Sequence, residues 1–407
     1  MSVRQRVMGL NGDEAVAWAV KQCDVDFVSA YPITPQTIIV EKFSEFVANG
    51  EVETEFVPVE SEHSALSACI GAAALGARAF TATAANGLAL MWEIVYIASS
   101  LRLPIVMAVV NRALSGPINI HCDHSDSMGC RDASWIQIYT ENAQEAYDTV
   151  IQAFRIGEHP DVQLPVMVTL DGFLISHTLQ NVKILPDEVV KDFVGVRKPV
   201  EVEIPGRGRI PLILDPENPL TFGPLDLYDY YFEHKVQQHE AIEKARPVIK
   251  QINEEYYKIS GRKYGDGFVE TYGLEDAETA IIVLGSTAGT VRYVAKELRR
   301  KGYKVGMLRL RTFRPFPYRE LVEALRHVKA VGVMDRSGAY GAYGGPVYIE
   351  TKAAFYDEDE KPKILNYIYG LGGRDTPPTM IRKVYEELLE VSRTGKIEKK
   401  MKFLGVR

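Results

Sequence analysis

Cysteine is scarce in this sequence, and the four present are scattered, at Cys23, Cys69, Cys122 and Cys130. No two of them have the Cys-x-x-Cys spacing that organises an iron–sulfur cluster or a structural zinc. We therefore expect neither kind of centre in this chain. Scattered thiols are typical of a reducing compartment, so the sequence predicts a cytoplasmic protein.

Long apolar runs and an excess of positive charge are also missing. No stretch is long enough to span a bilayer, and the first residues lack the apolar core of a secretory signal. Lysine and arginine number 47 against 54 aspartate and glutamate, so the net charge is −7. That balance disfavours nucleic acid or an anionic membrane as the main partner. The length of 407 residues has room for two or three domains.

Several motifs of nucleotide-binding and hydrolytic proteins are absent. No Gly-x-Gly-x-x-Gly follows the first predicted strand, and there is no Gly-x-Ser-x-Gly elbow. Gly265-Asp-Gly267 resembles the opening of a diphosphate and metal motif, but no buried strand precedes it and no asparagine lies between Asn253 and Asn366 to complete it. The glycine-rich loop at residues 338–345 lies between a predicted strand and a helix, where a phosphate could bind, but it does not match a P-loop.

The sequence does contain two runs of alternating strand-like and helix-like segments. In the first run, strands are predicted at 25–30, 52–59, 78–84, 103–110 and 165–170, and helices at 13–23, 36–47, 61–75, 87–100 and 143–157. In the second run, strands are predicted at 280–284, 304–310, 330–334 and 364–369, and helices at 289–300, 318–328, 347–355 and 380–391. Alternation of this kind predicts an α/β fold, with a doubly wound parallel sheet followed by a second α/β domain.

Between the two runs the pattern breaks. Proline and glycine are dense from about 181 to 231, which predicts an extended arm that packs against another surface. A polar helix is predicted at 234–257, before the domain boundary. The expected domains are residues 1–235 including the arm, a linker helix and loop at 236–270, and residues 271–407.

Polar residues follow the predicted strands of the first domain, where ligands bind in such folds. Tyr31-Pro-Ile-Thr-Pro-Gln-Thr37 joins a strand to a helix, and its two prolines stiffen the loop that carries Thr34. The segment could equally be a turn with a helix cap. Glu60 and Glu62 begin the next helix, either as capping acids or with one carboxylate facing the ligand crevice.

Arg112 ends the apolar run 103–110, and arginine is suited to bidentate recognition of a carboxylate. A solvated loop residue is the alternative. The following segment, His121-Cys-Asp-His-Ser-Asp126, contains metal-ligand types without the spacing that organises a metal site. A loop that covers substrate or forms an interface is the preferred interpretation, and no metal ligand is expected in this chain.

Several segments together resemble one family, the α subunits of 2-oxoacid:ferredoxin oxidoreductases, and most closely the pyruvate:ferredoxin oxidoreductase (pyruvate synthase) type. They are Tyr31-Pro-Ile-Thr-Pro35, Glu60-Ser-Glu-His-Ser-Ala65, Asn111-Arg-Ala-Leu-Ser115, Asp123-His-Ser-Asp126, Leu170-Asp-Gly-Phe-Leu-Ile-Ser-His177 and Leu310-Arg-Thr-Phe-Arg-Pro-Phe-Pro317. The resemblance spans nearly the whole chain. It implies an N-terminal thiamine-diphosphate-binding domain of the pyrimidine type and a C-terminal domain like that of transketolase.

The resemblance also implies a reaction. It is the reversible, CoA-dependent oxidative decarboxylation of pyruvate to acetyl-CoA and CO2, with thiamine diphosphate as cofactor and ferredoxin as electron acceptor. In this family the α subunit supplies the pyrimidine side of the cofactor site. A β subunit holds the diphosphate, its Mg²⁺ and a 4Fe-4S cluster, while γ and δ parts complete the CoA region and hold further clusters.

By position in these motifs, Glu62 is implied to hydrogen-bond the pyrimidine ring nitrogen of the cofactor. Thr34 and Arg112 are implied to contact the carboxylate of the substrate, with Tyr31 and Pro32 lining the same pocket.

Two alternatives stay open. A branched-chain 2-oxoacid could be the substrate, since these motif residues are implied to contact the carboxylate of the substrate and not its side chain. The loop Ser115-Gly-Pro-Ile-Asn-Ile120 favours pyruvate. The chain could also be a non-catalytic scaffold subunit. The joint presence of Thr34, Glu62 and Arg112 argues against this alternative.

Overall fold

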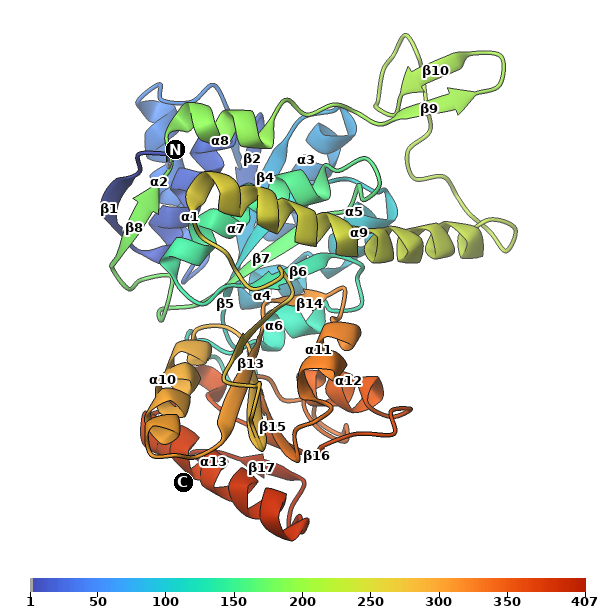
Figure 1. Cartoon of the computed structure of the whole chain (residues 1–407). Coiled ribbons are helices and arrows are strands. Elements are labelled where there is room, and N and C mark those ends of the chain that lie inside the picture. Colours follow the sequence, from blue (N-terminus) through green and yellow to red (C-terminus); the bar gives the residue numbers. More distant parts are fainter. Residues whose placement is uncertain (1–2) are drawn as a thin grey trace.

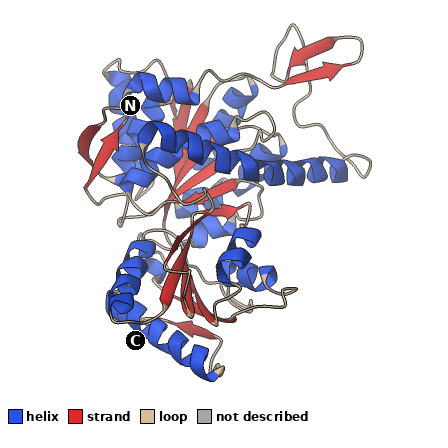
Figure 2. Ribbon diagram, viewed as in Figure 1, coloured by secondary structure: helices blue, strands red, loops and turns tan. Residues whose placement is uncertain are grey.

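A computed structural model describes residues 3–407, and its first half is built on a seven-stranded sheet with the order β14-β6-β7-β5-β4-β2-β3 (Figures 1 and 2). All neighbouring strands are parallel except the edge strand β14, which is antiparallel to β6. The strands are β2 (Phe27–Ala30), β3 (Glu55–Pro58), β4 (Ala79–Thr83), β5 (Val106–Asn111), β6 (Ile136–Tyr139), β7 (Val166–Asp171) and β14 (Thr312–Arg314).

Helices cover both faces of this sheet, which confirms the doubly wound α/β prediction. Central strand β5 shows why: Val106, Ala108 and Val110 enter the core under α1 and α7, while Met107 and Val109 enter the core under α3 and α5. A strand buried on both faces has no polar alternation, and the apolar run follows from this. The helices are α1 (Gly12–Gln22), α2 (Thr37–Ala48), α3 (Glu62–Ala74), α4 (Ala85–Leu90), α5 (Trp92–Ser100), α6 (Ser125–Gly129) and α7 (Ala143–Gly157).

The second half contains a six-stranded sheet with the order β11-β13-β12-β15-β16-β17, parallel except for β11. Helices α10 and α13 pack on one face, and α11 and α12 on the other. The strands are β11 (Val269–Tyr272), β12 (Thr279–Val283), β13 (Val305–Leu310), β15 (Ala330–Asp335), β16 (Lys363–Ile368) and β17 (Met401–Phe403). The helices are α10 (Thr287–Arg300), α11 (Tyr318–Leu325), α12 (Pro346–Ala354) and α13 (Pro378–Thr394), with a short 3-10 turn η1 (Leu371–Gly373).

The segment expected to be an extended arm is partly folded onto the body. Strand β8 (Gln180–Ile184) pairs with β1 (Arg6–Leu10), and α8 (Asp187–Val194) buries Val190, Phe193 and Val194. Strand β8 and helix α8 were missed because both are short and lie on either side of Pro186. The remaining arm carries the two-stranded ribbon of β9 (Glu201–Ile204) and β10 (Gly208–Pro211), which projects from the body in Figure 1.

The two halves are joined by more than a linker. Helix α9 (Tyr231–Ser260) begins earlier than expected and packs along α7, where the Tyr256 hydroxyl donates to Asp148 at 2.5 Å. Strand β14, from the second half of the chain, completes the edge of the first sheet. The sequence missed β6, β11, β14 and β17, because strands of three or four residues leave little periodicity to detect. The division into residues 1–235, 236–270 and 271–407 stays a prediction.

Within residues 3–407, the structure has no helix with the length and apolar character needed to cross a membrane. All four cysteines are free and buried.

Candidate functional site

The residues expected to form a site follow strands that run side by side and end at the same edge of the first sheet. The loop at 31–36 follows β2, Glu62 follows β3, Ala85 follows β4 and Arg112 follows β5. Strand β2 lies between β3 and β4, so the chain order reverses beside it. Such a reversal opens a crevice at the carboxyl ends of the strands, which is where ligands bind in doubly wound sheets.

Gln36 holds the loop at 31–36 in this crevice. Strands β2 and β4 pair only at Phe27 with Ala79 and Val28 with Phe80, and then separate. The fully buried Gln36 side chain bridges the gap: its amide donates to the Ala82 carbonyl at 2.8 Å, and its oxygen accepts from the Ile33 amide at 3.2 Å. Sequence reasoning missed Gln36, whose only signal was its place directly after Pro35.

The helix-capping role at the start of α3 does not belong to Glu62. Ser61 is the N-cap and accepts from the Ser64 amide at 3.2 Å, while the exposed Glu60 carboxylate accepts from the Ser64 hydroxyl. That hydrogen bond lowers the pKa of Glu60. Glu62 is 5% exposed, and its carboxylate accepts no hydrogen bond from any residue in the range 3–407. It is therefore free to bind something else.

The backbone of α4 approaches Glu62 closely at Gly87. A Cβ atom placed on Gly87 would lie 2.5 Å from Glu62 Oε1 and 2.5 Å from Thr83 Oγ1. The Thr83 hydroxyl is itself buried without a hydrogen-bond partner among the described residues. The glycine thus lets two oxygen-bearing side chains, which have unused hydrogen-bonding capacity among the described residues, lie directly against the backbone of α4.

Arg112 and Thr34 are in direct contact. Arg112 Nη1 donates to the Thr34 carbonyl at 2.9 Å, and Nε donates to the Asn119 carbonyl at 3.1 Å. The Arg112 side chain is nearly buried, while Thr34, Tyr31 and Pro32 are exposed on the adjoining loop. The Nη2 group makes no hydrogen bond within residues 3–407, so part of the guanidinium fork stays available.

Asp126 ties these two groups together. Its Oδ2 accepts from the Arg112 amide at 2.9 Å and from the Ala85 amide at 3.1 Å, and Ala85 begins the helix that carries Gly87. The structure therefore brings Thr34 and Arg112 into contact and joins them through Asp126 to the element beside Glu62. Within residues 3–407, neither the Glu62 carboxylate nor Arg112 Nη2 has a hydrogen-bond partner. Together they can bind a ligand that has both a ring nitrogen and an acidic group.

Comparison with known proteins decides the family. Residues 18–254 match the family model described as pyruvate flavodoxin/ferredoxin oxidoreductase, thiamine diphosphate-binding, and residues 277–381 match the pyruvate:ferredoxin oxidoreductase core domain II. The chain belongs to the pyruvate flavodoxin/ferredoxin oxidoreductase family. The family resemblance and the fold class expected from the sequence are confirmed.

Relatives within this family are similar over almost their whole length. The chain is 56% identical to the pyruvate synthase subunit PorA of Thermotoga maritima, over 98% of each chain. It is 50% identical to the PorA of Methanocaldococcus jannaschii, over 92% of this chain and 93% of that relative. It is also 42% identical to the ketoisovalerate oxidoreductase subunit VorA of Pyrococcus abyssi, over 98% and 97%.

Two solved structures share the fold. A 2-oxoglutarate:ferredoxin oxidoreductase from Magnetococcus marinus matches 95% of this chain with a TM-score of 0.70 and 22% identity. The present chain spans about 65% of that chain's length. A split-gene transketolase matches 95% of this chain and all of its own with a TM-score of 0.54 and 15% identity. These likenesses concern the fold alone.

The residues at this crevice fit one side of thiamine diphosphate. The Glu62 carboxylate and the Thr83 hydroxyl, neither of which has a hydrogen-bond partner within residues 3–407, suit a polar ring. The segment Gly265-Asp-Gly267, which resembles the opening of a diphosphate motif, forms a turn instead. In it, Asp266 Oδ1 accepts from the amides of Phe268 and Val269 at 2.9 Å. The sequence-based rejection of this motif therefore agrees with its role as a turn.

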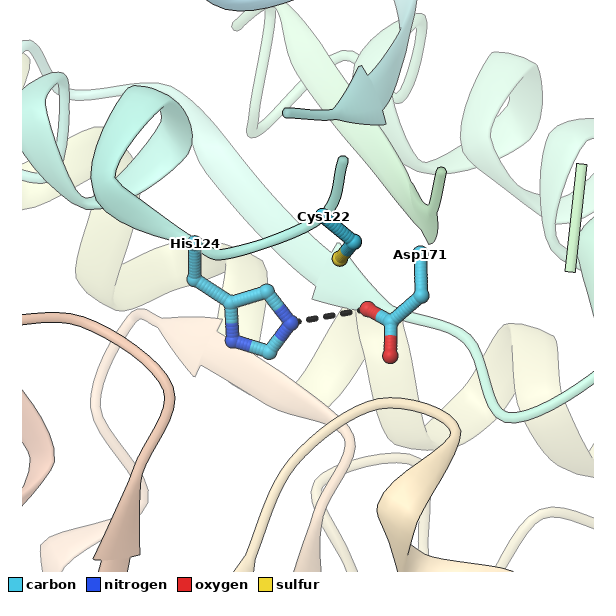
Figure 3. A group of neighbouring side chains, drawn as sticks. All are labelled: Cys122, His124 and Asp171. Atoms are coloured by element: carbon cyan, nitrogen blue, oxygen red, sulfur yellow. Dashed lines mark hydrogen bonds and ion pairs between the residues drawn. The ribbon is translucent and has the colours of Figure 1, made fainter. Parts of the chain in front are cut away.

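Three buried side chains with metal-ligand atoms lie close together: Cys122, His124 and Asp171 (Figure 3). Both Asp171 oxygens are already engaged. Oδ1 lies 2.8 Å from His124 Nε2, and Oδ2 accepts from Arg336 Nη1 at 2.9 Å and from the Ser286 hydroxyl at 2.5 Å. Burial opposes ionisation, but His124 and Arg336 outweigh it and hold the pKa of Asp171 below its usual range. Arg336 therefore already neutralises Asp171, and the group is an ion-pair junction between the two halves.

The glycine-rich loop at 338–345 is not free to bind a phosphate. It ends at the N-terminus of α12, where the amides of Val347 and Tyr348 donate to the buried Asp335 carboxylate at 2.8 and 3.1 Å. A side-chain carboxylate thus occupies the place that a phosphate would need.

Proposed function

We propose that this chain is the catalytic α subunit of a pyruvate:ferredoxin oxidoreductase. The reaction is the reversible, CoA-dependent conversion of pyruvate to acetyl-CoA and CO2. One observation carries the proposal: the nearly buried Glu62 carboxylate, which has no hydrogen-bond partner within residues 3–407, lies at the same sheet edge as the linked Thr34 and Arg112. The relatives named PorA support pyruvate as the substrate.

Glu62 is proposed to hold the cofactor by a hydrogen bond to the ring nitrogen of its aminopyrimidine. Thiamine diphosphate supplies the carbanion chemistry when bound. At this position a carboxyl group can exchange a proton with the ring nitrogen, because its oxygens are not engaged by the described residues. Gly87 leaves the space in which that carboxyl group stands.

Arg112 and Thr34 are proposed to bind the carboxylate of the 2-oxoacid. Arg112 Nη2 and the exposed Thr34 hydroxyl are the donors not used by the chain's own backbone contacts. Charge-assisted hydrogen bonds from a nearly buried arginine would fix the orientation of the oxo carbon. Tyr31 and Pro32 would line the pocket from the same loop.

The rest of the centre is proposed to come from partner subunits of a cytoplasmic complex. A β subunit would hold the diphosphate, Mg²⁺ and a 4Fe-4S cluster, and γ and δ parts would complete the CoA region and the electron path to ferredoxin. Supporting this, Thr34, Tyr31 and Pro32 are exposed in the single chain, as expected for a site that a neighbouring chain covers.

The second candidate is the α subunit of a branched-chain 2-oxoacid oxidoreductase, favoured by the VorA relatives at 42% identity. The third candidate is a non-catalytic scaffold. Such a subunit would not need the nearly buried Glu62 carboxylate at the same sheet edge as Arg112, whose guanidinium is oriented by backbone carbonyls.

The deciding experiment uses the native complex containing this chain. Acyl-CoA formation is measured from pyruvate, 2-oxoisovalerate and 2-oxoglutarate, with ferredoxin or a viologen as acceptor. We expect the highest kcat/KM with pyruvate. A preference for 2-oxoisovalerate would establish the second candidate, and a complex inactive with all three acids would contradict the proposed family activity. The same complex carrying Glu62→Gln measures the background from contaminating enzymes.

A further inference from the structure

The loop that follows β16 in the second half of the chain rests on the loop that follows Arg112. Asn119 Nδ2 donates to the Gly372 carbonyl at 3.1 Å, and the Gly372 amide donates to Asp123 Oδ2 at 3.2 Å. The next amide, of Gly373, donates to the Cys122 carbonyl at 2.7 Å. Three hydrogen bonds thus join segments about 250 residues apart in sequence.

Only glycine allows this contact to be so close. Gly372 has φ +58° and Gly373 has φ +80°, in the left-handed region that disfavours other residues. A Cβ atom on Gly372 would overlap Asn119 Nδ2, and one on Gly373 would overlap the His121 side chain. The side chains of Asn119 and His121 therefore lie directly against the glycine backbone, with no room for a side chain at residue 372 or 373.

Asn119 connects this contact to the candidate site. Its side-chain oxygen accepts from the His121 amide at 2.7 Å, and its amide group reaches Gly372. Its own carbonyl accepts from Arg112 Nε at 3.1 Å. The flanking side chains of Ile118 and Ile120 are exposed, so they contribute little to holding this part of the loop.

We propose that Asn119 is a positioning residue for Arg112, held in place by Gly372 of the C-terminal α/β unit. Through this backbone contact, the unit fixes the position of the Asn119 carbonyl. That carbonyl and the Thr34 carbonyl together fix two edges of the guanidinium, so that Nη2 points in one direction. The inference rests on the proposed role of Arg112 in binding the carboxylate of the 2-oxoacid.

Two substitutions disturb the contact from opposite sides. Asn119→Asp keeps the oxygen that accepts from His121 but loses the donor to Gly372 and places a charged oxygen against its carbonyl. Gly372→Ala pushes Asn119 away from the other side. Gly395→Ala is the matched control, because Gly395 has φ +69° and a Cβ atom there would have no neighbour within 4 Å.

The variants are compared in the purified complex. We expect the KM for pyruvate to rise roughly tenfold in Asn119→Asp and in Gly372→Ala, because a charged donor loses its ordered acceptor. The KM for CoA and the activity of Gly395→Ala should stay at the wild-type value. Equal rises in the KM for pyruvate and for CoA, or unchanged values in both variants, would overturn the positioning role.

A double variant separates this inference from the proposed function. In an Arg112→Ala background, Asn119→Asp should raise the KM for pyruvate no further, since residues that act through one another are not additive. An additional rise would mean that Asn119 acts elsewhere. If Arg112→Ala alone raises the KM and the Asn119 and Gly372 variants do not, only the positioning role fails. If Arg112→Ala leaves the KM unchanged, the proposed carboxylate contact itself fails.

Discussion

Arg112 donates to the main-chain oxygen of Thr34 at 2.9 Å, across two loops that follow the strands on either side of β4. The contact orients the arginine through a backbone atom and leaves the threonine hydroxyl unused. Both residues can therefore act on one ligand. Asp126 anchors the Arg112 amide in the same region and shares its carboxylate with Ala85.

Glu62→Gln should lower turnover of the complex by a factor on the order of a hundred or more, because the amide cannot exchange a proton as the carboxyl group does. Assembly should be intact, since Glu62 makes no hydrogen bond within residues 3–407 that the substitution would break. The check is kcat for pyruvate oxidation beside the size of the complex. Glu60→Gln is the control: Glu60 is exposed and its side chain contacts only the Ser64 hydroxyl, so near-wild-type turnover is expected. A wild-type rate in Glu62→Gln would remove the assigned role.

Arg112→Ala should raise the KM for pyruvate and lower kcat/KM by about one to two orders of magnitude, the range for losing a hydrogen bond from a charged group. Steady-state kinetics at varied pyruvate measure this. Arg112→Lys keeps the charge but loses the planar fork, so it should fall between wild type and alanine. An unchanged KM in both variants would mean that the carboxylate is bound elsewhere.

Gly87→Ala should reduce turnover about tenfold or more, because the added methyl group would stand 2.5 Å from Glu62 Oε1 and force that carboxylate to move. In a helix the same change normally stabilises by about 1 kcal/mol, so a loss of activity cannot come from helix propensity. The measurement is kcat together with the melting temperature. Gly71→Ala, on the exposed side of α3 with no atom within 4 Å of its added methyl group, should keep full activity. Equal activity of the two variants would argue against the close packing of Gly87 on Glu62.

Asp13 should make the stability of the chain depend on pH. It is fully buried in the first turn of α1, and neither carboxylate oxygen has a hydrogen-bond partner among the described residues. Burial, and to a smaller extent Glu14, raises the pKa of Asp13 well above its usual value. The imidazole of His177 lies nearby, with Nδ1 3.8 Å from Oδ2, but burial lowers the pKa of this imidazole and so disfavours its charged form.

The sign follows from proton binding. Above the unfolded pKa of about 3.9, the folded chain keeps a proton that the unfolded chain has lost, so the free energy of unfolding falls as pH rises towards the folded pKa. Asp13→Asn cannot titrate, so its stability relative to wild type should improve from pH 5 to pH 8. Urea unfolding of the purified chain at both pH values measures the difference. Asp229→Asn, an exposed change, should follow wild type. A difference between Asp13→Asn and wild type that is the same at both pH values would contradict the prediction.

Local patterns predicted the elements well where the element is long and its environment uniform. The helix predicted at 143–157 is found as α7 with the same bounds, and the apolar run at 103–110 covers all of β5 except its last residue. The run predicted as one helix at 87–100 is broken at Met91 into α4 and α5. The turn at 265–267 was not predicted, although the hydrogen bonds that form it join residues two or three apart.

What the sequence by itself determined is the alternation of strands and helices, the edge of the sheet at which Thr34, Glu62 and Arg112 stand, and the family to which their motifs belong. These depend on residues near one another along the chain. Only the tertiary structure decided that Arg112 bonds to Thr34, that Gln36 fills the gap between β2 and β4, and that β14 closes the first sheet. It also decided that Asp171 pairs with Arg336 and Asn119 with Gly372. These partners lie tens to hundreds of residues apart, and their pairing depends on how the two sheets pack. Local hydrophobic periodicity in the sequence contains no information on that packing.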